Sequence, residues 1–146
     1  MRSPGVLVLA LLAVSAPASA AEFRSIAETG TVLYDAPSVK SKKLFVTTRL
    51  YPVEIVVNID NWVKVRDQAG DLAWVEKKAL SERRTVIVTA QVAEVRQTAS
   101  EQSSLLFQAQ QGVALEVAEL SASGWVKVRH VDGQTGYVRI GDVWGL

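Results

Sequence analysis

The chain has 146 residues, one histidine, no cysteine and a formal net charge of +1. This near-balance of charge argues against a general binder of nucleic acids or anionic membranes, which would show a clear basic excess. The absence of cysteine excludes disulfides. Together with the single histidine, it also excludes a Cys–His peptidase and a zinc centre built from several N or S ligands.

Residues 1–20 have the pattern of a secretory signal peptide. Arg2 precedes an unbroken apolar run, Val6 to Val14, and Ala18-Ser19-Ala20 forms a small-residue cleavage site. The run is shorter than the ~20 residues that span a bilayer. We therefore expect cleavage before Ala21, an exported protein that is periplasmic or secreted, and no stable membrane insertion after cleavage.

The next part of the chain alternates between apolar and polar residues over short stretches, which predicts β-strands. The expected strands are near Phe23–Ala27, Thr31–Tyr34, Tyr51–Val57, Trp62–Arg66 and Ala73–Val75. Asp35–Leu50 is a longer polar segment, in which we expect Leu44-Phe45 to reach the core. Lys78-Ala79-Leu80 is expected to form a helical or 3₁₀ turn.

This arrangement is repeated. Trp-Val-Lys-Val-Arg at 62–66 recurs letter for letter at 125–129. Equivalent residues of the two copies are 62 positions apart up to Val57 and 63 positions apart from Trp62 onward. The change places one inserted residue in the turn Leu120–Gly124 and marks that turn as a hairpin tip. The second set of strands is expected near Val86–Ala90, Ala93–Arg96, Ala114–Leu120, Trp125–Arg129 and Thr135–Val138, with a helical or 3₁₀ turn at 140–143.

The repeat predicts an all-β protein of two tandem small β-barrels, each of about five short strands. The expected domains are 22–82 and 85–146, joined by the short linker 81–85. A copy of about 60 residues is marginal by apolar burial alone. We therefore expect the two copies to share an interface and to be stiffly coupled.

Four blocks of copy 2 follow a familiar order and spacing: Val95 to Ser100, Gln111 to Val117, Gly124 to Val128 and Gly133 to Val138. They resemble a bacterial SH3 (SH3b) domain. The usual Asn-Val-Arg-Ser-Gly-Pro-Ser box is degraded at 94–100, where Gly and Pro are missing. Copy 1 is more divergent, with Ala73-Trp74 where the family has Gly-Trp. The resemblance implies a partly open barrel in each half and an exported recognition module that binds peptidoglycan or its peptides.

The sequence offers no catalytic constellation. A Ser–His–acid arrangement would have to use His130, which lies beside Asp132 in a predicted hairpin, and no Gly-x-Ser-x-Gly turn is present. We interpret His130 as a solvent-facing residue at a strand end. Glu54 and Glu116 occupy equivalent positions, which indicates a structural role. We expect no enzymatic activity, no cofactor and no metal.

The candidate ligand-binding residues are Trp62, Trp125, Tyr34 and Arg96. Both tryptophans open a strand beside a turn, a position that lines a shallow groove in SH3-type folds. Tyr34 and Arg96 occupy equivalent positions beside the long polar segment, where they would rim such a groove. Hairpin packing alone also explains the rings, because aromatic residues stabilise cross-strand pairs. The sequence leaves these two interpretations open.

We therefore predict a non-catalytic exported module of the bacterial envelope that recognises cell-wall peptide or glycan. The alternative is a structural or adaptor protein that docks on another envelope protein and has no wall ligand. No nucleic-acid partner is expected. The oligomeric state stays open.

Overall fold

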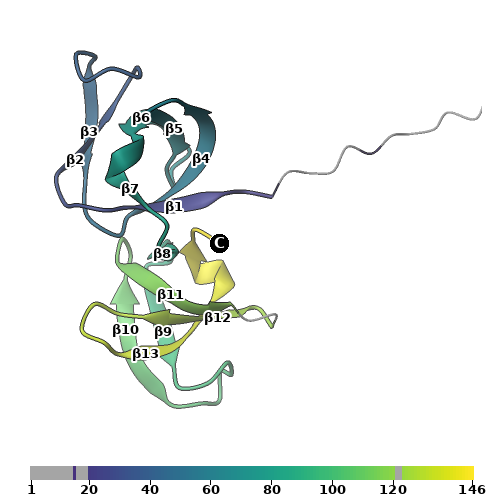
Figure 1. Cartoon of the computed structure of the whole chain (residues 1–146). Coiled ribbons are helices and arrows are strands. Elements are labelled where there is room, and N and C mark those ends of the chain that lie inside the picture. Colours follow the sequence, from purple (N-terminus) through teal and green to yellow (C-terminus); the bar gives the residue numbers. More distant parts are fainter. Residues whose placement is uncertain (1–14, 16–19, 121–122) are drawn as a thin grey trace, which may run out of the picture.

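The structure is a computed structural model that describes residues 15, 20–120 and 123–146 (Figure 1). Apart from Ser15 and Ala20, the expected signal peptide lies outside the described residues. Residues 121–122, in the turn Leu120–Gly124 where one inserted residue is expected, also lie outside them. Within the described parts, the chain forms two antiparallel sheets of seven strands each, one per copy.

The first sheet, here called barrel 1, contains β1 (Phe23–Ile26), β2 (Thr31–Tyr34), β3 (Lys43–Thr47), β4 (Pro52–Ile59), β5 (Trp62–Arg66), β6 (Leu72–Glu76) and β7 (Leu80–Ser81), with the 3₁₀ helix η1 (Lys77–Ala79). The second, barrel 2, contains β8 (Thr85–Val88), β9 (Val92–Arg96), β10 (Leu105–Gln110), β11 (Ala114–Leu120), β12 (Trp125–Arg129), β13 (Thr135–Arg139) and β14 (Val143–Trp144), with η2 (Ile140–Asp142).

The strand orders are the same in the two barrels. They are β3-β2-β6-β5-β4-β1-β7 and β10-β9-β13-β12-β11-β8-β14. Even the irregularities repeat, because register shifts occur after Ile55 in β4 and after Val117 in β11, which are equivalent positions. The predicted all-β fold of two tandem SH3-like barrels is confirmed.

Each barrel has seven strands, more than the five or so that the sequence predicted. The two short closing strands β7 and β14 follow the expected 3₁₀ turns. The other additional strands are β3 and β10, which lie inside the long polar segments. β3 pairs with β2 from Thr31↔Thr47 to Tyr34↔Lys43, so only the tip of that segment is a loop. Alternation is hard to recognise in β3 because its first four residues are all exposed.

Each barrel has its own apolar core, formed by the inward-facing residues of its strands. In barrel 1 the core consists of Ile26, Leu33, Val53, Val63, Val65, Ala73 and Val75. In barrel 2 it consists of Val86, Val88, Ala93, Val95, Ala109, Leu115, Val126, Val128 and Val138. The Trp-Val-Lys-Val-Arg repeat explains this, because its two valines point inward in both copies while its other three residues point outward.

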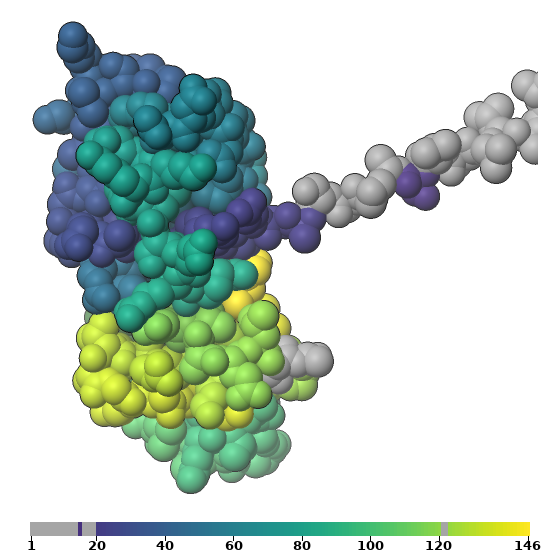
Figure 2. Space-filling view, in the orientation of Figure 1, coloured from purple at the N-terminus to yellow at the C-terminus, as the bar shows by residue number. Residues whose placement is uncertain are grey.

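The two barrels share an interface, as expected. The ring of Phe23 in β1 meets the ring of Trp144 in β14 edge to face, with centroids 5.1 Å apart. The Arg84 guanidinium lies 5.6 Å from the Phe23 centroid and donates a hydrogen bond of 3.1 Å to the Gly145 carbonyl. Figure 2 shows the C-terminal residues, in yellow, meeting the purple β1 region and the teal linker at this junction. No helix among the described residues is long and apolar enough to cross a membrane.

Candidate functional site

Strand alternation places a row of aromatic and charged side chains on the outer face of each barrel. In β5 and β6 of barrel 1, the residues that flank the buried valines are partly exposed. Cross-strand register pairs Trp62 with Glu76, and Lys64 with Trp74. These side chains share a face because directly opposite residues in an antiparallel pair point the same way. We call this surface the outer aromatic face.

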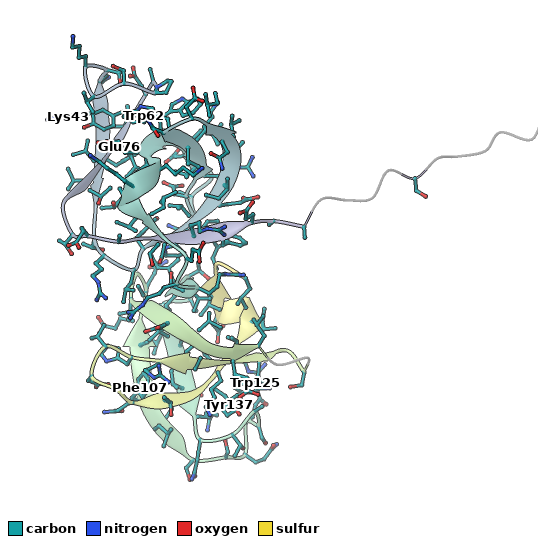
Figure 3. All side chains as sticks on the ribbon, in the orientation of Figure 1. Lys43, Trp62, Glu76, Phe107, Trp125 and Tyr137 are labelled. Atoms are coloured by element: carbon teal, nitrogen blue, oxygen red, sulfur yellow. The ribbon has the colours of Figure 1, made fainter. Side chains whose placement is uncertain are left out.

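In barrel 1 the centre of the outer aromatic face is a pair of rings. Tyr34 and Trp62 meet edge to face, with centroids 5.6 Å apart and planes at 81°. Tyr34 is only 8% exposed, whereas Trp62 is partly exposed. Tyr34 therefore supports the Trp62 ring, and Trp62 provides the contact surface. Lys43 is opposite Tyr34 in the register, and Figure 3 shows it near Trp62 and Glu76 at one end of the barrel.

Barrel 2 has the same tryptophan in different surroundings. The Arg139 guanidinium lies 5.3 Å from the Trp125 ring centroid, in a cation–π arrangement. Arg139 also pairs with Glu101 of the long segment between β9 and β10. Beside this group, the Lys127 Nζ lies 6.0 Å from the Tyr137 ring centroid. The outer face of barrel 2 therefore contains two ring–cation contacts, and the cation of one of them, Arg139, is paired with the Glu101 carboxylate.

Arg96 takes the position in barrel 2 that Tyr34 takes in barrel 1. Its guanidinium donates a hydrogen bond of 2.9 Å to the Ser103 carbonyl and is 2.5 Å from the Glu94 carboxylate. The Arg96 side chain is 19% exposed. The bond to Ser103 fixes the segment between β9 and β10. Because the guanidinium already has two partners, few of its N–H groups are left to bind a ligand.

The structure thus divides the four predicted residues between two places. Tyr34 and Trp62 contact each other in barrel 1, whereas Trp125 and Arg96 lie in barrel 2 on either side of Tyr137. Figure 3 shows Trp62 and Trp125 in separate barrels, so they do not form one concave patch. Whether any of these residues binds a ligand stays a prediction.

Sequence reasoning missed several members of the outer aromatic faces. They are Lys43, Trp74 and Glu76 in barrel 1, and Glu101 and Arg139 in barrel 2. Because every second residue of a strand lies on the same face, the alternation that starts at Trp62 and Trp125 predicts Trp74, Glu76 and Arg139 on these faces. No local pattern would have found Lys43 or Glu101. Lys43 joins the face through the pairing of β3 with β2, and Glu101 lies in the long segment between β9 and β10.

The remaining candidates for chemistry have structural partners. Glu54 pairs with Arg66 at 3.0 Å, and Glu116 lies 3.9 Å from Arg83. The His130 ring packs against Phe107, with centroids 5.8 Å apart, so it is not simply solvent-facing. The described residues contain no group of three or more His, Cys, Asp or Glu placed to hold a metal ion.

Asp132 is bound locally rather than poised for catalysis. Its carboxylate accepts a hydrogen bond of 2.9 Å from the Gln134 backbone N–H and lies 3.2 Å from the His130 Nδ1. The Gln134 hydrogen bond, and then the His130 ring, hold the pKa of Asp132 below its usual value. The arrangement stabilises the β12–β13 turn.

Two short-stranded barrels, each with a 3₁₀ closure before its last strand and aromatic residues on its outer face, define a tandem SH3-like protein. The chain belongs to the bacterial SH3 domain family, whose family model matches residues 27–82 and 90–145, once in each barrel. No curated protein matches the chain.

Several solved structures are similar to the chain at low identity. NlpC1 from Trichomonas vaginalis is 15% identical with a TM-score of 0.38, and the match covers 99% of this chain and 52% of that one. NlpC2 from the same organism is 14% identical with a TM-score of 0.38, covering 87% and 49%. An NlpC/P60 family protein from Bacillus cereus is 17% identical with a TM-score of 0.36, covering 84% and 56%. The chain spans about half the length of these structures, and similarities of this size support no functional argument.

Proposed function

We propose that the protein is a non-catalytic exported binding module that recognises cell-wall peptidoglycan, through its peptide or its glycan. The observation that carries the proposal is the Tyr34–Trp62 pair, in which a partly exposed indole is held edge to face on a buried phenol. Membership of the bacterial SH3 domain family supports a binding role. The exported location rests on the signal-peptide pattern of residues 1–20.

The chemistry of the barrel 1 face suits such a ligand. A flat indole supplies a large apolar contact at low entropic cost, against a sugar ring or an aliphatic side chain. On the same face, Lys43 lies opposite Tyr34, Lys64 lies opposite Trp74, and Glu76 lies opposite Trp62. The Glu76 carboxylate is 3.3 Å from the Lys78 ammonium. Stem peptides present both carboxylates and amines, so charges of both signs around an apolar platform match their composition.

The two barrels should contribute unequally. In barrel 2 the Arg139 guanidinium lies over the Trp125 ring and is tied to Glu101. A ligand would have to displace that guanidinium before it could stack on the indole. Barrel 1 has no such cover on Trp62 among the described contacts, so we assign the larger share of binding to barrel 1.

Sedimentation of residues 21–146 with purified peptidoglycan tests the proposal. We expect Trp62→Ala to reduce the bound fraction strongly, Trp125→Ala to reduce it weakly, and the double variant to abolish it, with circular dichroism confirming the fold. Val131→Ala is the control for loss of an exposed apolar side chain, because Val131 is 74% exposed and lies in the turn between β12 and β13, away from the outer aromatic faces.

Two results would overturn the proposal. If the protein does not sediment with peptidoglycan and crosslinking in the envelope recovers a protein partner, the adaptor alternative replaces it. If soluble fragments are released from peptidoglycan, the protein is not a non-catalytic module.

A further inference from the structure

A second surface, distinct from the outer aromatic faces, runs along β3. It is a hollow of about 430 Å³, within the usual size range of ligand sites. Its lining includes Phe45 and Val46, which are 41% and 71% exposed, together with the ring of Tyr51. Large apolar side chains with this much exposure, gathered at one hollow, are typical of an interaction site.

The hollow borders an edge strand. Phe45, Val46 and Thr47 of β3 line it, followed by Thr48. Successive side chains of a strand point to opposite faces, so both faces of β3 contribute to the lining. Leu33 of β2 also lines it, so part of the hollow lies on the inward face of the β2–β3 pair. β3 is the outermost strand of its sheet and pairs only with β2. Its other side therefore presents a row of backbone groups that can accept a further strand.

The other walls of the hollow come from the β5–β6 turn and from barrel 2. Asp67 and Gln68, from the β5–β6 turn, face β3 across the hollow, and Ile87 and Gly112 of barrel 2 line it as well. The hollow thus borders the established interface between the barrels.

The repeat places a comparable hollow in barrel 2, of about 400 Å³. Phe107 to Gln110 line it where Phe45 to Thr48 line the first, and Val113 and His130 replace Tyr51 and Asp67. Two independent copies of the fold therefore open at the same place along an edge strand. The hollow in barrel 1 is the more apolar at β3, because Val46 stands where barrel 2 has Gln108.

The charge of the hollow selects its occupant. Its lining contains the Asp67 carboxylate and no Lys or Arg. One carboxylate oxygen of Asp67 accepts hydrogen bonds from the backbone N–H groups of Ala69 and Asp71. Tyr51 lines the same hollow, and burial, and then the charge of Asp67, raise its pKa.

We propose that this hollow binds an extended polypeptide segment that adds as a strand to the free edge of β3. An apolar side chain of the segment packs among Phe45, Tyr51 and Ile87, and a neighbouring basic side chain pairs with Asp67. Backbone hydrogen bonds to the edge supply affinity, and the alternating apolar and basic positions supply specificity. The site goes beyond the proposed recognition of peptidoglycan and uses none of the outer aromatic residues.

A blocked hexapeptide of alternating valine and lysine is the probe. Titrated into ¹⁵N-labelled residues 21–146, it should shift the amide signals of β3, Gln68, Ile87 and Gly112. We expect Val46→Lys to weaken binding about tenfold, because it places a charge at the apolar edge. Val39→Lys is the matched control, since Val39 is 56% exposed and does not line the hollow.

One further peptide and one further variant distinguish strand addition and charge recognition from nonspecific apolar binding. A hexapeptide N-methylated at alternate residues should not bind, because it cannot pair with the edge. Asp67→Asn keeps a carbonyl oxygen that can accept the two turn hydrogen bonds but removes the charge. It should therefore abolish the preference for the lysine peptide over a valine–glutamate peptide.

Other outcomes would overturn the proposal. These are no binding of the lysine peptide, equal binding of the N-methylated peptide, or signal shifts confined to Trp62 and Trp125. Self-association through β3 without peptide would instead identify a second copy as the occupant. Trp62→Ala/Trp125→Ala should bind the hexapeptide like the parent, so failure of peptidoglycan binding and failure of this site are separate results.

Discussion

The two barrels have the same backbone and different surfaces. Their strand orders and register shifts coincide, and both cores are built largely from valine. On the outer face, however, Tyr34 of barrel 1 is a buried support for Trp62, whereas its equivalent Arg96 is a hydrogen-bonding clamp. Inward positions are restricted by packing density, while outward positions only have to suit water and their neighbours. Duplication thus preserved the fold and left the surface free to diverge.

The same contrast occurs in the turn before β4 and before β11. The backbone there adopts a positive φ in both barrels, 71° at Leu50 and 87° at Gly112. Both residues donate an equivalent hydrogen bond, to the Ile26 and Val88 carbonyls. Glycine adopts this conformation freely, whereas leucine does so at a cost. Leu50 is only 7% exposed, so burial of its side chain offsets the backbone strain.

The largest effect should come from the cores. Val53 and Leu115 occupy equivalent positions, and both are fully buried. We expect Leu115→Ala to lower the free energy of unfolding by about 3 kcal/mol and Val53→Ala by about 2 kcal/mol, because the larger deletion leaves the larger cavity. Urea unfolding followed by tryptophan fluorescence measures both. A smaller loss for Leu115→Ala than for Val53→Ala would show that the two cores are not packed alike.

The interface should be nearly as sensitive. A Cβ at Gly145 would lie 2.6 Å from the Thr85 carbonyl oxygen and 3.2 Å from the Pro52 Cβ, and neither atom belongs to a flexible side chain. We expect Gly145→Ala to cost about 2 kcal/mol. Gly141→Ala is the control, since no atom lies within 4 Å of its Cβ position. The Thr85 contact lies within barrel 2, the Pro52 contact joins the barrels, and the φ of 127° at Gly145 adds backbone strain. Equal stability of the two variants, measured by thermal unfolding, would contradict the close packing around Gly145.

Removing the Arg96 clamp tests the difference between the outer faces. Arg96→Ala deletes the bonds to the Ser103 carbonyl and the Glu94 carboxylate, and we expect a loss of about 1.5 kcal/mol. Amide hydrogen exchange should become faster at Gln97, whose N–H bonds to the Ser104 carbonyl. The exposed Arg129→Ala should leave that exchange unchanged. Unchanged exchange in Arg96→Ala would mean that the segment is held by other contacts.

The positive-φ turn offers a smaller and more specific test. Gly112→Ala should cost about 1 kcal/mol through backbone strain alone, because no atom lies within 4 Å of its Cβ position. In barrel 1, Leu50→Gly should be more stable than Leu50→Ala, since glycine relieves the strain that alanine keeps. Chemical denaturation gives the order of the two variants, and the reverse order would show that strain at Leu50 is negligible.

The smallest effect concerns pH. Burial, and then Asp67, raise the pKa of Tyr51 above its ordinary value of 10.0, so the folded state favours the neutral phenol. The stability from this shift is fully present below pH 10.0 and is lost as the pH rises through the folded pKa. We expect the parent to lose more stability than Tyr51→Phe above that pH, as measured by urea unfolding at a series of pH values. Parallel stability curves would place Tyr51 in water in both states.

Much of the fold could be predicted from the sequence because the chain contains the repeat twice. Trp62–Arg66 and Trp125–Arg129 identified the central hairpins through a period of two. β3 and β10 escaped prediction for the opposite reason. Edge strands bury little, and β3 shows no alternation in its first four residues, so only its pairing with β2 reveals it as a strand.

The candidate sites divide in the same way. The sequence by itself determined the duplication, the all-β class and the two tryptophans, because these depend on the order and period of residues along a strand. Only the tertiary structure decided that Tyr34 supports Trp62, that Arg139, paired with Glu101, lies over Trp125, and that a hollow opens beside β3 and barrel 2. Each of these features joins residues from different strands or different barrels. Their proximity follows from chain folding and cannot be obtained from local spacing.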